Sequence, residues 1–105
     1  DVNRPKDNGV TPAYIAAQEG HLEVLRLLFE KGAVANQARE DGSTPAYVAA
    51  QDSHLEVLRL LVEKGADLNK ATDDGLTPVF IAAVNGHTAA LDLLVKAGAD
   101  ANQAR

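Results

Sequence analysis

The chain has 105 residues, no Cys and a formal net charge of −5. This length predicts a single domain over residues 1–105, and without Cys there is neither a disulfide framework nor a thiolate metal site. The acidic balance argues against a nucleic-acid-binding protein, which needs a basic face. There is no apolar run long enough to cross a membrane and no secretory leader, so we expect a cytoplasmic or otherwise intracellular protein.

An internal repeat organises the chain. Three Thr-Pro pairs begin at Thr11, Thr44 and Thr77, each 33 residues after the previous one, and Gly, His, Ala-Ala and Gly-Ala positions recur in the same register. A fixed period of this size predicts one small unit built three times and stacked as a solenoid. We place the units at about residues 7–39, 40–72 and 73–105, with residues 1–6 as the remnant of a preceding unit.

Each unit contains the signals of two short helices. In the first unit, Thr11 reads as an N-cap, and the Pro that follows it begins a helix over Pro12–Glu19. Gly20 is expected to end this helix in the left-handed conformation. A second helix with a broad apolar face follows over Leu22–Lys31, and an extended loop then leads to the next Thr-Pro. Two helices this short cannot bury their apolar faces alone, so neighbouring units must cover them.

Two departures from the repeat are informative. The middle unit has Ser53 where the other units have Gly20 and Gly86. A left-handed Ser costs about 1 kcal/mol relative to Gly, so we expect local strain there. In the third unit, Thr88 and Ala90 stand where the first two units have a Leu and a Val, which should leave the last helix the most weakly packed.

The central unit resembles the ankyrin repeat in its segments Asp41–Ala50, His54–Leu61 and Gly65–Asn69. The resemblance extends over the chain in three copies at the family's period. It implies an all-α solenoid of stacked antiparallel helix pairs with projecting β-hairpin-like fingers. It also implies a protein-protein interaction module that binds a partner in a concave groove, without catalysis and without a cofactor.

The resemblance also assigns the groove residues. On the fingertips they are Lys6, Asp7, Asn8, Val10, Arg39, Glu40, Asp41, Ser43, Thr72, Asp73, Asp74 and Leu76. On the first helix of each unit they are Ala13, Gln18, Glu19, Ala46, Gln51, Asp52, Val79, Val84 and Asn85.

One difference from the family pattern occurs in all three units. An aromatic ring stands where the family has His, at Tyr14, Tyr47 and Phe80, and the preceding Leu is reduced to Ala or Val. The simplest interpretation is an exchange of volume between units, although Tyr is also a frequent interface anchor. The hydrogen bond from the family's His to the Thr side chain is either lost or remade by a Tyr hydroxyl.

The histidines and acidic residues do not suggest chemistry. Equivalent residues of stacked units lie about 8–10 Å apart, so His21, His54 and His87 cannot share a metal ion whose bonds are about 2 Å long. We expect them to serve at the helix junctions. Asp41, Asp73 and Asp74 stand in turn sequences without a nucleophile or base, so neither catalysis nor Ca²⁺ binding is expected.

Asn36, Asn69 and Asn102 occupy the position that an asparaginyl hydroxylase can modify in intracellular ankyrin arrays. Each has a Leu eight residues earlier, as the resemblance requires. The alternative is that this Asn only satisfies backbone groups of the loop.

The sequence does not identify the binding partner. The fingertips carry more acid than base, which suits either a solvated loop or the steering of a basic partner. A structural or engineered scaffold without a dedicated partner, and a regulatory fragment of a larger protein, are the alternative functions. Neither end has a polar cap, so we expect apolar strips near Leu22 and Leu25 or Val95 and weak end-to-end self-association.

Overall fold

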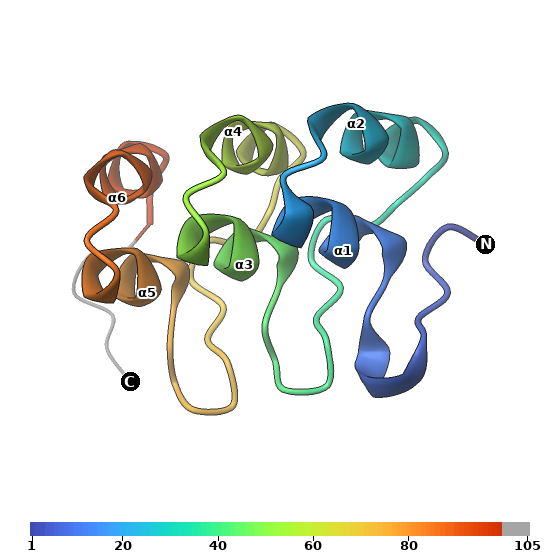
Figure 1. The fold of residues 1–105 in the computed structure, drawn as a ribbon, viewed down its shortest axis with the longest axis horizontal. Helices are drawn as coiled ribbons and strands as arrows, with labels where there is room; N and C mark the ends of the chain where they lie inside the picture. Colours follow the sequence, from blue (N-terminus) through green and yellow to red (C-terminus); the bar gives the residue numbers. More distant parts are fainter. Residues whose placement is uncertain (100–105) are drawn as a thin grey trace.

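The computed structural model describes residues 1–99, which fold into helices arranged as three pairs. A short 3₁₀ turn, η1 (Asp7–Gly9), precedes the first pair, and no strand occurs in the described part of the chain. Figure 1 shows one layer formed by the first helix of each pair and a second layer formed by the second helix. The helices are α1 (Pro12–Glu19), α2 (Leu22–Glu30), α3 (Pro45–Gln51), α4 (Leu55–Glu63), α5 (Pro78–Val84) and α6 (Thr88–Lys96).

The helix boundaries follow the sequence signals. The hydroxyl of Thr11 accepts a hydrogen bond from the backbone N–H of Tyr14, and the two equivalent Thr residues do the same in their units. Gly20 ends α1 with φ 75°, as predicted. Helix α2 ends one residue earlier than expected, with Lys31 as its C-cap.

Ser53 adopts the left-handed conformation that its place in the repeat predicts. Its φ is 57°, against 75° and 70° for the equivalent Gly20 and Gly86. The stacking of identical units therefore holds a Ser in a conformation that its Cβ disfavours.

The core lies between the two helical layers and between neighbouring repeats. Leu25, Leu58, Leu61 and Leu94 are its largest fully buried apolar side chains, and Ala-Ala pairs let α1 and α3 approach each other closely. The prediction that Leu25 lies on an exposed end face is wrong, because this residue is fully buried between α2 and its neighbours. Val95 is exposed as predicted, and Leu22 is half-buried.

The first repeat instead exposes Ile15, Val24 and Leu27, at 42%, 50% and 53% of their side-chain surfaces. Their equivalents in the second repeat, Val48, Val57 and Leu60, are at most 4% exposed. The difference arises because the second repeat packs against the first, whereas these residues of the first repeat have no such neighbour in the structure.

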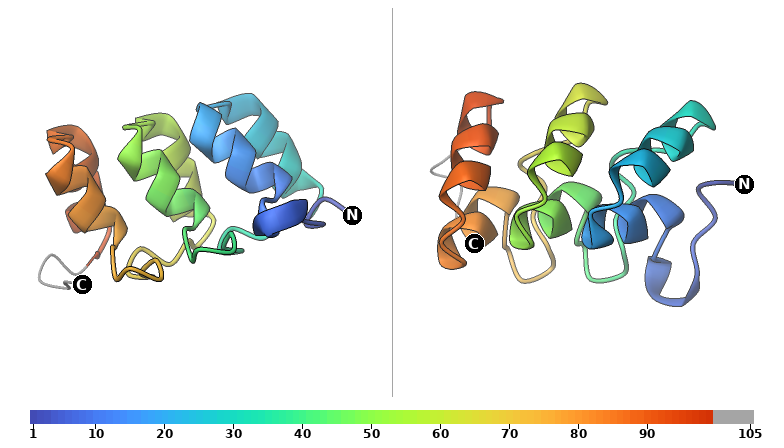
Figure 2. Two further views of the ribbon diagram at one scale, coloured as in Figure 1. Left: turned by 60° about the horizontal axis from the view of Figure 1, so that its bottom comes forward. Right: turned by 45° about the horizontal axis from the view of Figure 1, so that its top comes forward.

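The fingers project on one side of the helical layers and lie next to one another (Figure 2). Each finger is closed by a backbone hydrogen bond, of which Arg39 N–H to the carbonyl of Ser43 is an example at 2.9 Å. Adjacent fingers are also joined, because Glu40 N–H donates to Asn8 and Asp73 N–H donates to Asp41. The fingers therefore form a continuous row fixed by backbone contacts.

Within residues 1–99, none of the helices has the length and apolar character needed to traverse a lipid bilayer.

Candidate functional site

Most of the predicted fingertip residues are accessible. Asp7, Asn8, Glu40, Asp41, Asp73 and Asp74 are exposed, and Lys6 is exposed beside them. Arg39 and Thr72 are half-buried. Ser43 was expected at the surface, but only 3% of it is exposed, because its side chain turns inward to a hydrogen bond with the preceding repeat. Val10 and Leu76 are partly buried and pack against the core, so their side chains anchor the fingers.

The first helices of the units contribute a second group of residues. Glu19, Asp52, Val84 and Asn85 are exposed, and Gln18 and Gln51 are half-buried. The expected groove positions Ala13, Ala46 and Val79 are wrong, because all three are buried at the contacts between repeats. The accessible groove surface is thus mainly polar and acidic.

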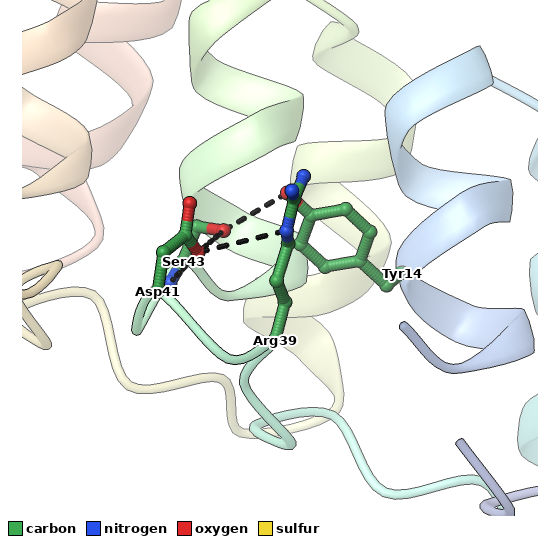
Figure 3. A network of polar contacts seen from close by, with 4 residues as sticks. All are labelled: Tyr14, Arg39, Asp41 and Ser43. Carbon is green, nitrogen blue, oxygen red and sulfur yellow. Dashed lines mark hydrogen bonds and ion pairs between the residues drawn. The ribbon is translucent and has the colours of Figure 1, made fainter. Parts of the chain in front are cut away.

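A hydrogen-bonded network joins the first two repeats (Figure 3). The hydroxyl of Tyr14 lies 2.9 Å from Ser43 Oγ, and Ser43 Oγ donates to Asp41 Oδ1 at 2.6 Å. Because Ser43 has one hydroxyl proton and gives it to Asp41, Tyr14 must be the donor to Ser43. The hydrogen bond from Ser43 holds the pKa of Asp41 below its ordinary value, against the opposing effect of burial.

Arg39 completes this network. Its guanidinium carbon lies 5.8 Å from the centre of the Tyr14 ring, within the range of a cation–π interaction. Its Nε lies 3.7 Å from Asp41 Oδ1, which is an ion-pair distance but too long for a hydrogen bond. The side chains of Tyr14, Ser43, Asp41 and Arg39 therefore form one network between the first helix of the first repeat and the second finger.

The Tyr hydroxyl does not replace the bond to Thr that the family's His would make. Thr11 Oγ1 accepts from the backbone of Tyr14, whereas the Tyr14 hydroxyl reaches Ser43 of the next repeat. Tyr14 and Tyr47 are 2% and 7% exposed, so both rings pack within the stack.

A pocket of about 440 Å³ opens between the second and third fingers. Tyr47 lies in its wall with Gln51, and the carboxylates of Asp41, Asp73 and Asp74 surround its mouth. Burial, and then the nearby Asp41, Tyr14 and Asp74, raise the pKa of Tyr47, so its hydroxyl stays protonated at neutral pH. Sequence reasoning missed this pocket, although the change from Ser43 to Leu76 at one repeat position was a signal for it.

All three histidines lie at the helix junctions, as predicted, because each is the residue before the second helix of its unit. Two of them also bind the previous repeat. Nε2 of His54 lies 3.0 Å from the carbonyl of Gln18, and Nε2 of His87 lies 2.9 Å from that of Gln51. Each bond joins one repeat to the previous one. In the described range 1–99, no group of three or more His, Asp or Glu side chains is placed to hold a metal ion.

The Asn residues that recur at one position of each repeat also form hydrogen bonds with backbone groups. Asn36 accepts from Asp67 N–H and donates to the carbonyl of Gly65, as Asn3 does one unit earlier. Asn102 lies outside the described residues. Hydroxylation at this position stays a prediction.

Comparison with known proteins agrees with this geometry. Residues 32–105 match the family described as "Ankyrin repeats (3 copies)", and residues 8–39 match the family described as "Ankyrin repeat". A 36-residue segment is 44% identical to the E3 ubiquitin-protein ligase XBAT32 of Arabidopsis thaliana. This similarity covers 34% of the chain and 7% of the length of that protein.

Proposed function

Because this chain belongs to the ankyrin repeat family, we propose that it is a non-catalytic module that binds a protein partner in the groove between its fingers and its first helices. The partner offers a basic surface to the fingers. The function of the plant ubiquitin ligase is not carried over to this chain, because the similar segment is only 7% of the length of that protein.

One observation supports the proposal most strongly. The fingers are fixed to one another by backbone hydrogen bonds, while the side chains of Glu40, Asp73 and Asp74 stay exposed. A surface that is already ordered loses little conformational entropy on binding, so its charges can contribute fully to recognition.

The acidic character of the groove favours a protein over a nucleic acid. Asp41 is the one fingertip carboxylate with an ion pair in the described part of the chain, and its partner is Arg39. The remaining carboxylates would repel a phosphate backbone.

The test is affinity capture with the intact chain and two charge-matched variants. Changing Asp73 and Asp74 to Asn removes two charges from the fingers, and changing Glu30 and Glu63 to Gln removes two from the outer helices. We expect a protein that is retained by the parent and by the outer-helix variant but lost by the finger variant. Equal retention by all three would contradict binding at the fingers.

End-to-end association of copies is a second candidate interaction. Exposed Ile15, Val24 and Leu27 support it, since their equivalents in the second repeat are covered by the first. Val95 of the third repeat is also exposed.

A further inference from the structure

The two junctions between adjacent fingers are built from equivalent positions but hold different side chains, and residues of both junctions line the 440 Å³ pocket. In the first, the guanidinium of Arg39 lies over the Tyr14 ring and beside Asp41, and Ser43 receives the Tyr14 hydroxyl. The chain thus supplies its own cation and its own hydroxyl partner there.

The second junction keeps the aromatic ring and the carboxylate but lacks the other two groups. Tyr47 and Asp74 are equivalent to Tyr14 and Asp41, whereas Thr72 replaces Arg39 and Leu76 replaces Ser43. The third finger therefore contributes no cation, and its Thr72 hydroxyl accepts a hydrogen bond from the backbone N–H of Leu76 instead of meeting Tyr47.

This substitution leaves the Tyr47 hydroxyl without the protein partner that the Tyr14 hydroxyl has. The residue is only 7% exposed, yet its hydroxyl has no hydrogen-bond partner among residues 1–99 and it lines the 440 Å³ pocket. The ring is buried, but the hydroxyl is in contact with the space of the pocket. A donor that enters the pocket can therefore reach the hydroxyl oxygen.

The charges around the pocket specify the charge of such a donor. Asp73 and Asp74 are exposed at the mouth and form no ion pair within the described residues, and Arg39, the one cation of the lining, is paired with Asp41. An anion would be repelled here, whereas a cation would gain both the carboxylates and the face of the ring.

We propose that the pocket beside Tyr47 binds the side chain of an arginine of the partner protein. Its guanidinium lies above the Tyr47 ring, just as the guanidinium of Arg39 lies above the Tyr14 ring. It also donates a hydrogen bond to the Tyr47 hydroxyl oxygen and forms an ion pair with Asp74. Arginine suits this site better than lysine because its planar, multi-donor group both stacks on a ring and bridges two acceptors. This inference rests on the proposed function and names the group that the groove recognises.

The first test uses small probes, so that it does not depend on finding the partner. N-acetyl-arginine amide, the matching lysine compound and the matching citrulline compound are titrated into the chain, and the NMR signals of the Tyr47 ring are followed. We expect saturable shifts with arginine, weaker ones with lysine and none with uncharged citrulline. Absence of an arginine effect at Tyr47, or an equal effect of citrulline, would overturn the proposal.

Variants then separate the pocket from general charge. Asp74→Asn should weaken arginine binding about tenfold, as expected for loss of a charge-assisted hydrogen bond. Glu30→Gln removes one charge from the exposed side of α2, away from the groove, and should leave binding unchanged. The double substitution Thr72→Arg with Leu76→Ser gives Tyr47 the same two neighbours that Tyr14 has. The new arginine of the chain should then occupy the site and abolish binding of the probe, while circular dichroism confirms that the chain is folded.

The two proposals can fail separately. If a captured protein is retained equally by the parent, by Tyr47→Phe and by the refilled double variant, the groove binds a partner but the arginine site is wrong. If the arginine probe binds at Tyr47 and no protein is captured at the fingers, the pocket chemistry holds and the proposed function fails.

Discussion

Tyr14 and Tyr47 occupy the same position of successive repeats, yet among residues 1–99 only the hydroxyl of Tyr14 finds a hydrogen-bond partner. The difference follows from the residue that the next repeat supplies, Ser43 in one case and Leu76 in the other.

The two tyrosines should therefore respond differently to the same substitution. Tyr14→Phe removes the bond to Ser43 and should lower the free energy of unfolding by about 1 kcal/mol. Tyr47→Phe removes a hydroxyl without a partner and should leave stability nearly unchanged. Urea denaturation of the two variants measures this, and equal losses would show that Tyr47 has a partner after all.

Ser53→Gly should stabilise the chain. Ser53 has φ 57°, and relief of its left-handed conformation is worth about 1 kcal/mol. The reverse change, Gly20→Ala, should destabilise more, because a Cβ there would lie 2.7 Å from Nδ1 of His54. Denaturation midpoints of both variants provide the test, and a Ser53→Gly chain no more stable than the parent would contradict the strain.

The histidine junctions should contribute to stability unequally. His87→Ala removes the bond to the carbonyl of Gln51 and should cost about 1–2 kcal/mol. His21→Ala is the matched control, since His21 is exposed and forms no such bond within the described chain. Similar losses in thermal unfolding for both variants would refute a role specific to the junction.

Acid should remove the contribution of Asp41. The hydrogen bond from Ser43 keeps the folded-state pKa of Asp41 below the ordinary value of 3.8. Its stabilising effect is thus complete above that value and is lost as the pH falls through the lower folded-state pKa. The stability difference between the parent and Asp41→Asn should be present near neutral pH and disappear in acid. A Ser43→Ala background should reduce this pH dependence, and a difference that persists at low pH would contradict the assignment.

Self-association should depend on the exposed apolar end of the first repeat. We expect the chain to form larger species at high concentration and Val24→Glu with Leu27→Lys to suppress them, because both residues are half exposed. Sedimentation velocity over a concentration series tests this. A chain that stays monomeric throughout, with or without the substitutions, would rule it out.

The architecture could be predicted from the sequence because its signals are local. Thr-Pro pairs and the glycines at helix ends fix where each helix begins and ends, and the period fixes how the units stack. The strained Ser53 was predicted for the same reason, since its position in the unit determines its backbone conformation.

The details of the groove depended on which side chains meet across repeats. When a helix has a broad apolar face, its sequence does not show which of the apolar residues are buried within their own repeat. For this reason Leu25 was predicted to be exposed at an end face, whereas Leu27 was not. Ser43 and Leu76 stand at equivalent fingertip positions, but only Ser43 receives a hydrogen bond from the Tyr14 hydroxyl of the preceding repeat. The unpaired Tyr47 hydroxyl could be identified only from three-dimensional contacts.

Every substantial contact between helices joins the same repeat or adjacent ones. The side chains at positions 72 and 76 can therefore alter the lining of one pocket while the helices that they follow keep the same neighbours. Duplication of a whole unit would copy its pocket along with its fold, so an array of this kind can acquire a new recognition chemistry one junction at a time.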